Sequence, residues 1–226
     1  MITNTNENDI KVVEVNKKRV IQTPNQRMTF IKNNLNLPNK ISYKQKSIVT
    51  VNSIKYEIND LDNNERTMYK CKSKTTSESF ELSNLSGSVL FKFKLKKVNI
   101  GCFDFIITDC TTGKEKIATI KILPSMTKNI FQVQFINEEN GKEESLYFYL
   151  EDQSKRYVFY GGIESEGGEL ICRAIGNYEN LKYLIEFASN IDRTFVFMLL
   201  FSLNRYLHCH PKDIPGNFVF MGQRYI

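Results

Sequence analysis

Two runs of alternating lysines are the residues of this chain whose type and spacing best suggest binding chemistry. A lysine stands at every second position of each run, and the residues between those of the second run are Phe93 and Leu95. Side chains of a β-strand alternate between its two faces, so each triplet would point outward while its neighbours point into a core. The six residues, named the lysine face from here on, are Lys70, Lys72, Lys74, Lys92, Lys94 and Lys96.

An anionic partner is what the lysine face predicts. If one short strand, Ser79–Leu82, separates the two runs, they lie about 10 Å apart. Ammonium groups near a membrane attract anionic lipid headgroups by roughly 1 kcal/mol each. The competing interpretation is that outward lysines only keep half-buried strands soluble and protect their edges from aggregation. Both interpretations stay open. Nucleic acid is the less favoured anion, because its binding uses aromatic side chains beside the basic ones, and here the aromatics alternate away from the lysines.

The distribution of charge along the chain also favours an anionic partner. The net charge is +6, and 22 of the 31 basic residues but only 12 of the 25 acidic residues lie within residues 1–130. A basic first part fits membrane lipid headgroups or nucleic acid. The same excess also serves solubility alone, so it does not decide between the two interpretations.

The sequence predicts no metal site and no catalytic site. The run His208–His210 holds three possible ligands, but zinc needs four and no second cluster is visible. Acidic residues at 60–62 and 138–144 do not fit a calcium-binding loop. The two histidines stand together, which leaves no dispersed set of nucleophile and base. The glycine pairs at 161–162 and 167–168 match no phosphate-binding loop. We therefore expect no enzymatic activity, no cofactor and no metal.

The elements that must position the lysine face are short strands separated by turn signals. About eleven or twelve strands, spaced by roughly 8–14 residues, are typical of an all-β barrel or sandwich. No helical pattern alternates with them, which argues against a parallel α/β sheet. The expected strands are Ser47–Ile58, Thr67–Lys74, Ser79–Leu82, Val89–Lys96, Cys102–Thr108, Lys116–Leu123, Ile130–Ile136, Ser145–Glu151, Arg156–Tyr160, Glu169–Ile175 and Leu181–Ala188.

A helix over about 190–208 follows the strands, and its apolar residues lie on every side. Phe195–Phe201 is an uninterrupted apolar run, and a helix that is apolar all round must be enclosed. A bilayer span needs about 20 mostly apolar residues, so this shorter run is a core helix. Ser189 and Asp192 have the spacing of a capping box at its start. A large antiparallel barrel has room for such a helix. The fold class is therefore mainly β, an antiparallel barrel of about twelve strands enclosing a hydrophobic C-terminal helix.

We expect one domain behind a polar leader. Residues 1–45 would be a loosely ordered leader with short edge strands at Lys11–Val15 and Met28–Lys32, and residues 46–226 a single barrel domain, with Asn217–Met221 adding a last strand. The chain begins without an apolar signal segment, and its five scattered cysteines suggest reduced thiols. We expect an intracellular, cytoplasmic protein that docks peripherally on a membrane if it binds lipid.

Three segments resemble the tubby C-terminal-like superfamily. The first runs from Phe80-Glu-Leu through Leu85-Ser-Gly to Leu90, and the second from Phe105-Ile-Ile-Thr-Asp109 to Thr112-Gly-Lys. The third is the helix Ile191–Leu203 with its leading Ile-Asp pair. The most similar branch is the LURP-one-related proteins, with phospholipid scramblases next. The resemblance covers about residues 47–208. The polar leader is unmatched, and the segment after the helix is longer than the resemblance leads one to expect.

The resemblance implies a twelve-stranded barrel around a hydrophobic helix, and it bears on function without deciding it. Tubby domains bind phosphoinositides through basic barrel residues, although their positions do not map onto this chain one by one. The first hypothesis is a non-enzymatic module that docks on anionic phospholipid through the lysine face. The alternative is a protein-interaction or signalling adaptor without lipid binding. Lipid scrambling is the least favoured, because the one apolar helix is needed in the core.

Overall fold

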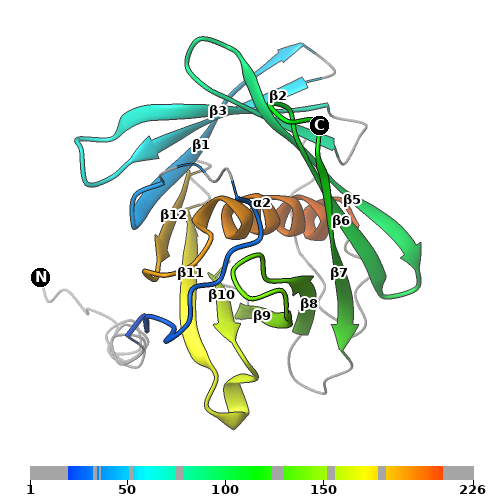
Figure 1. Cartoon of the computed structure of the whole chain (residues 1–226). Helices are drawn as coiled ribbons and strands as arrows, with labels where there is room; N and C mark the ends of the chain where they lie inside the picture. Colours follow the sequence, from blue (N-terminus) through cyan, green and yellow to red (C-terminus); the bar gives the residue numbers. More distant parts are fainter. Residues whose placement is uncertain are drawn as a thin grey trace, which may run out of the picture.

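Twelve strands form a closed antiparallel barrel in the computed structural model of the chain (Figure 1). The structure describes residues 20–32, 35, 37–50, 53–74, 79–123, 130–151, 156–177 and 182–210, and of residues 44–50, 53, 74, 151, 177, 208 and 209 only the backbone. Each strand pairs with its neighbours in the chain, and β1 closes the barrel against β12. The expected fold class, a barrel around a hydrophobic C-terminal helix, is confirmed.

The elements lie close to the expected ones from the third strand onward, where each boundary falls within three residues of its expected place. The strands are β1 (Lys40–Thr50), β2 (Ser53–Asp60), β3 (Arg66–Lys74), β4 (Ser79–Ser83), β5 (Val89–Asn99), β6 (Cys102–Asp109), β7 (Glu115–Leu123), β8 (Ile130–Ile136), β9 (Glu143–Glu151), β10 (Arg156–Gly161), β11 (Glu169–Asn177) and β12 (Lys182–Phe187). A short 3-10 turn, η1 (Glu164–Glu166), lies between β10 and β11, and the helix is α2 (Arg193–Cys209).

The expected strand Ser47–Ile58 is wrong, because this part of the chain forms a hairpin of two strands. β1 begins seven residues earlier, at Lys40, and β2 begins at Ser53. Neither glycine nor proline marks the reversal between Thr50 and Ser53, so the pattern reads as continuous. The expected edge strands Lys11–Val15 and Asn217–Met221 lie outside the described residues.

The helix α2 runs through the interior of the barrel (Figure 1). From Thr194 to Leu207 every side chain except that of Arg205 is buried. The Phe201 ring contacts aromatic rings of β1, β2, β4 and β5 at centroid distances of 4.7–6.3 Å. Nearer the start of the helix, Phe195 contacts rings of β6 and β8 at 6.1 and 5.3 Å. The helix is apolar all round because barrel wall surrounds it.

The helix starts three residues later than expected, and Asp192 rather than Ser189 caps it. Asn190 has a positive φ of 59°, which is not helical, and the first helical residue is Arg193. One carboxylate oxygen of Asp192 accepts the N–H of Phe195 at 2.9 Å, as a helix cap does. The capping box predicted from Ser189 is therefore wrong, since the Ile191–Asp192 pair still belongs to the extended chain.

The second oxygen of Asp192 ties a preceding segment to the helix. We call the described residues between 20 and 39 the strap; Figure 1 shows it in dark blue. The N–H groups of Phe30 and Ile31 donate to this oxygen at 3.1 and 2.7 Å. Met28 forms an isolated parallel bridge with Ile191, which is all that remains of the expected strand Met28–Lys32. Phe30, Ile31 and Leu37 join the barrel core, so this part of the expected leader is packed rather than loose.

A buried polar cluster fixes the other half of the helix. Asn204 is 8% exposed and points at three tyrosines of the barrel wall. Its amide oxygen accepts hydroxyl protons at 2.5 and 3.3 Å, and its amide N–H donates to a third hydroxyl at 3.0 Å. Burial raises the pKa of Tyr43 and of Tyr157 well above the usual tyrosine value, so both hydroxyls stay neutral. The three tyrosines are Tyr157, Tyr183 and Tyr43.

Candidate anion-binding face

The strands β3, β4 and β5 carry the lysine face on the outside of the barrel. β4 pairs with β3 on one side and with β5 on the other, as expected for one short strand between the two lysine runs. Two strand spacings place Lys72 and Lys92 about 10 Å apart along the sheet. These segments form strands because polar and apolar residues alternate along them, which suits a sheet with one face in the core and the other exposed to solvent.

Five of the six lysines are exposed. Their neighbours Cys71, Phe91, Phe93 and Leu95 are at most 5% exposed and line the interior. Lys74 lies in β3, but its side chain is outside the description. The exposed lysines are Lys70, Lys72, Lys92, Lys94 and Lys96.

An acidic residue of β4 interrupts the lysine face. Glu81 lies directly opposite Lys72 of β3 and Lys92 of β5. Its carboxylate forms an ion pair with the Lys92 ammonium at 3.7 Å, with both side chains about half exposed (43% and 55%). The two lysine runs therefore share one surface but not an unbroken row of positive charge. Sequence reasoning missed this contact, because only the strand register shows which residue of β4 stands between the runs.

Further charged residues border the lysine face. Lys55 of β2 is exposed and pairs with Lys72, so it extends the positive surface by one strand. Glu57 of β2 lies opposite Lys70, and Asp104 of β6 lies opposite Lys96. These neighbours were not singled out from the sequence, because the strand register decides which residue of an adjacent strand lies opposite each lysine.

The end of the face near the β5–β6 hairpin has the least neutralised charge. Lys94 stands between Ser79 of β4 and Ile106 of β6, neither of which is acidic. Lys97 follows Lys96 and is also exposed. Among the described residues at this end of the face, the ammonium groups outnumber the carboxylates, of which Asp104 is one, so an anion that approaches from outside would be attracted here.

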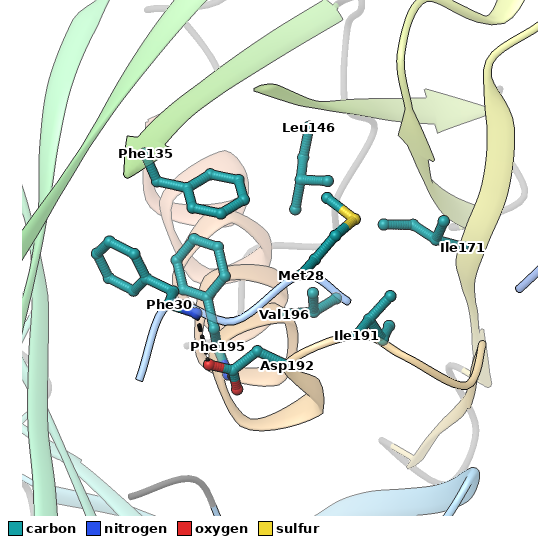
Figure 2. A pocket seen from close by; sticks show the side chains of 9 residues that line it. All are labelled: Met28, Phe30, Phe135, Leu146, Ile171, Ile191, Asp192, Phe195 and Val196. Carbon is teal, nitrogen blue, oxygen red and sulfur yellow. Dashed lines mark hydrogen bonds between the residues drawn. The ribbon is translucent and has the colours of Figure 1, made fainter. Parts of the chain in front are cut away.

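A void beside the start of α2 offers no room for a small-molecule ligand. It has a volume of about 10 Å³ (Figure 2). A cavity needs about 10–15 Å³ to hold a single water molecule, so the void is far smaller than any substrate. Asp192 is the only charged residue in its wall, and the carboxylate oxygens of Asp192 already accept the N–H groups of Phe195, Phe30 and Ile31. The other wall residues are Met28, Phe135, Leu146, Ile171, Ile191 and Val196.

The described residues hold no group of three or more possible metal ligands. The side chains of His208 and Cys209 lie outside the description, and the ring of His210 stacks on Tyr206 at 4.8 Å. Cys71 and Cys172 are buried, and burial raises the pKa of both thiols. Such thiols are poor nucleophiles and poor ligands.

Among the residues that the structure places, no helix has the length and apolarity that crossing a bilayer requires.

A family model described as LURP-one-related matches residues 39–204. The matched range begins one residue before β1 and ends within α2, so it takes in the whole barrel. It starts earlier than the resemblance seen in the sequence, since the first strand starts earlier. No curated protein and no solved structure matches the chain.

Proposed function

The chain belongs to the LURP-one-related family, within the tubby-like superfamily, and from this premise we propose that it is a non-enzymatic module that docks on anionic phospholipid. The lysine face is the docking surface, and phosphoinositide headgroups are the preferred anions, because each carries several phosphate charges. Ammonium groups on rigid strands meet such headgroups without any chemical step, so docking requires no pocket.

The observation that carries this proposal is the shared exposure of five lysines on β3 and β5, the two strands that flank β4: Lys70, Lys72, Lys92, Lys94 and Lys96. A protein that needed lysines only for solubility would gain as much from spreading them around the barrel. Their side chains instead stand on one continuous part of the wall, separated by Ser79, Glu81 and Ser83 of β4.

The magnitude of the attraction is modest. With Lys55 the face has six described ammonium groups, and the carboxylates of Glu57, Glu81 and Asp104 lie among them, which leaves an excess of three positive charges. At about 1 kcal/mol per basic residue near an anionic surface, the excess supplies about 3 kcal/mol. Binding is therefore weak, and added salt weakens it further because exposed charges are screened.

Co-sedimentation with vesicles of graded phosphoinositide content tests the proposal. The informative variant is Lys94→Glu/Lys96→Glu, because these lysines lie where the face is least neutralised. The matched control is Lys114→Glu/Lys142→Glu, which changes the net charge equally at exposed positions in the turns before β7 and β9. Removing four units of positive charge from the face should lower vesicle binding by about a hundredfold or more, while the control stays within about threefold of wild type.

Two outcomes would overturn the proposal. A folded wild-type protein that ignores anionic vesicles at low salt does not dock on lipid, and a protein-interaction or signalling adaptor then becomes the working function. Equal losses in the two double variants would show that net charge alone, rather than the lysine face, controls binding.

A further inference from the structure

The tip of the β5–β6 hairpin exposes apolar side chains right beside the lysine face. Val98 is 54% exposed and Ile100 is 96% exposed, so the described residues cover almost nothing of Ile100. The residues directly before them, Lys96 and Lys97, are exposed as well. Figure 1 shows this green hairpin at the right of the view. Isolated exposed aliphatic residues are common on proteins, and what distinguishes this pair is the shape and the charge around it.

The shape of the tip follows from two local features. A register shift between Lys97 and Asn99 marks a β-bulge, which breaks the alternation that buries every second residue of β5. Gly101 then reverses the chain with a positive φ of 72°, a conformation that glycine adopts without strain. All residues from Lys96 to Ile100 are exposed as a result.

The tip is also held in place. The carbonyl of Gly101 accepts the N–H of Ile122 at 2.7 Å, which joins the hairpin tip to the end of β7. Ile100 therefore projects from a braced turn of a three-stranded part of the barrel wall. Because the turn is already ordered, inserting this side chain into a bilayer requires no further ordering of the backbone, which lowers the entropy cost of insertion.

Lysines surround this apolar tip. Lys94 and Lys96 approach it along β5, Lys97 adjoins it, and Lys121 of β7 is exposed opposite Cys102, one strand away. An exposed apolar turn surrounded by long basic side chains is complementary to the boundary between phosphate headgroups and acyl chains. Lysine stems are apolar and their ammonium groups polar, so they suit the same boundary.

We propose that the tip formed by Val98 and Ile100 inserts into an anionic bilayer while Lys94, Lys96, Lys97 and Lys121 contact the headgroup phosphates around it. This inference rests on the proposed lipid docking and adds an anchor and an orientation to it. The barrel approaches the membrane with the β5–β6 hairpin first. Apolar insertion adds to the modest charge attraction, and it makes part of the binding resistant to salt.

Tryptophan fluorescence tests the insertion directly, because the chain contains no tryptophan. Ile100→Trp places a single reporter at the tip. The matched control is Ile136→Trp on β8, where the native side chain is 52% exposed and lies opposite Glu143. Anionic vesicles should shift the emission of the Ile100→Trp variant to the blue, and lipids brominated on their acyl chains should quench it. The emission of the Ile136→Trp variant should stay unchanged in both measurements.

A second pair of variants measures the affinity that the tip contributes. Val98→Ser/Ile100→Ser keeps every charge and removes little packing, since both side chains are exposed. Removing two inserted aliphatic side chains should weaken vesicle binding by at least about tenfold. The control Ile136→Ser/Ile175→Ser replaces exposed residues (52% and 43%) elsewhere on the barrel and should change binding by less than about twofold.

The outcomes separate the two proposals. If wild type does not bind anionic vesicles, lipid docking fails and insertion fails with it. If wild type binds and depends on Lys94 and Lys96, but the tip serines change nothing and the tryptophan at the tip neither shifts nor is quenched, insertion alone is refuted. A blue shift of the tip tryptophan without quenching by brominated acyl chains also refutes insertion, because the tip then rests among headgroups.

Discussion

Replacing Asp192 with alanine should be among the most damaging single changes in the described part of this protein. The carboxylate is 2% exposed and accepts three backbone N–H groups from two separate segments. One of them, from Phe195, belongs to the first turn of α2. The other two belong to the strap: one comes from Phe30, which Figure 2 shows beside Asp192, and the other comes from Ile31. Alanine leaves all three without this acceptor.

The size of the effect follows from these contacts. Loss of a helix cap costs about 1 kcal/mol. Each buried N–H group left without an acceptor costs about 1–3 kcal/mol. Burial raises the pKa of this carboxyl, which means that holding the charge already costs the native protein some free energy. We therefore expect Asp192→Ala to lower the free energy of unfolding by about 3–5 kcal/mol.

Urea unfolding followed by circular dichroism measures this loss, since the midpoint falls while the slope stays near that of wild type. The matched control is Asp62→Ala, in the exposed turn between β2 and β3, which should cost less than about 0.5 kcal/mol. A loss below about 1 kcal/mol for Asp192→Ala would refute the reasoning, because the strap and the helix would then not depend on this carboxylate.

Two further changes test the buried polar groups. Burial raises the pKa of the Asp192 carboxyl, so the native protein gains extra stability when this carboxyl is protonated; that extra part is fully present below the unfolded-state pKa and is lost as the pH rises through the folded-state pKa, while the three backbone hydrogen bonds remain. In urea titrations Asp192→Asn should therefore cost more stability near pH 3.5 than at pH 7, and an equal cost would contradict a raised pKa. Asn204→Leu removes the partner of three buried hydroxyls and should cost about 2–4 kcal/mol by thermal unfolding. Ser202→Ala is its control, because the Ser202 hydroxyl has no hydrogen-bond partner among the described residues; similar losses in both would contradict a role for the tyrosine cluster.

The lysine face illustrates what alternation can and cannot predict. Phe91, Phe93 and Leu95 are buried while the lysines between them are exposed, as period-two spacing predicts. Whether a charged residue lies beside a charge of opposite sign depends on strand register. Here the register of the short strand β4 sets which of its residues lies between the two lysine runs. Glu81 stands between Lys72 and Lys92 because β4 pairs with both partners at that position. A shift of β4 by one residue would point Glu81 into the core instead.

The helix also shows which features the sequence predicts and which depend on tertiary contacts. An apolar residue on every side of α2 predicts enclosure from the sequence alone, since no surface helix could tolerate Phe195, Phe197 and Phe201 together in water. The start of the helix was predicted three residues too early. Both Ser189 and Asp192 are good caps, and the choice between them depends on the strap: Met28 pairs with Ile191 and keeps that residue extended.

The sequence by itself determined the properties that depend on neighbours along the chain: an all-β domain, most of its strands, the outward placement of the described lysines, and an enclosed helix. These follow from side-chain alternation and from the cost of exposing apolar surface, which act over a few residues. Only the tertiary structure decided the hairpin of β1 and β2, the packing of the strap, the position of Glu81 and the exposure of Ile100. The first three depend on which backbone lies opposite in the folded barrel, which strand register and closure set, and the exposure of Ile100 depends on the β-bulge at the end of β5.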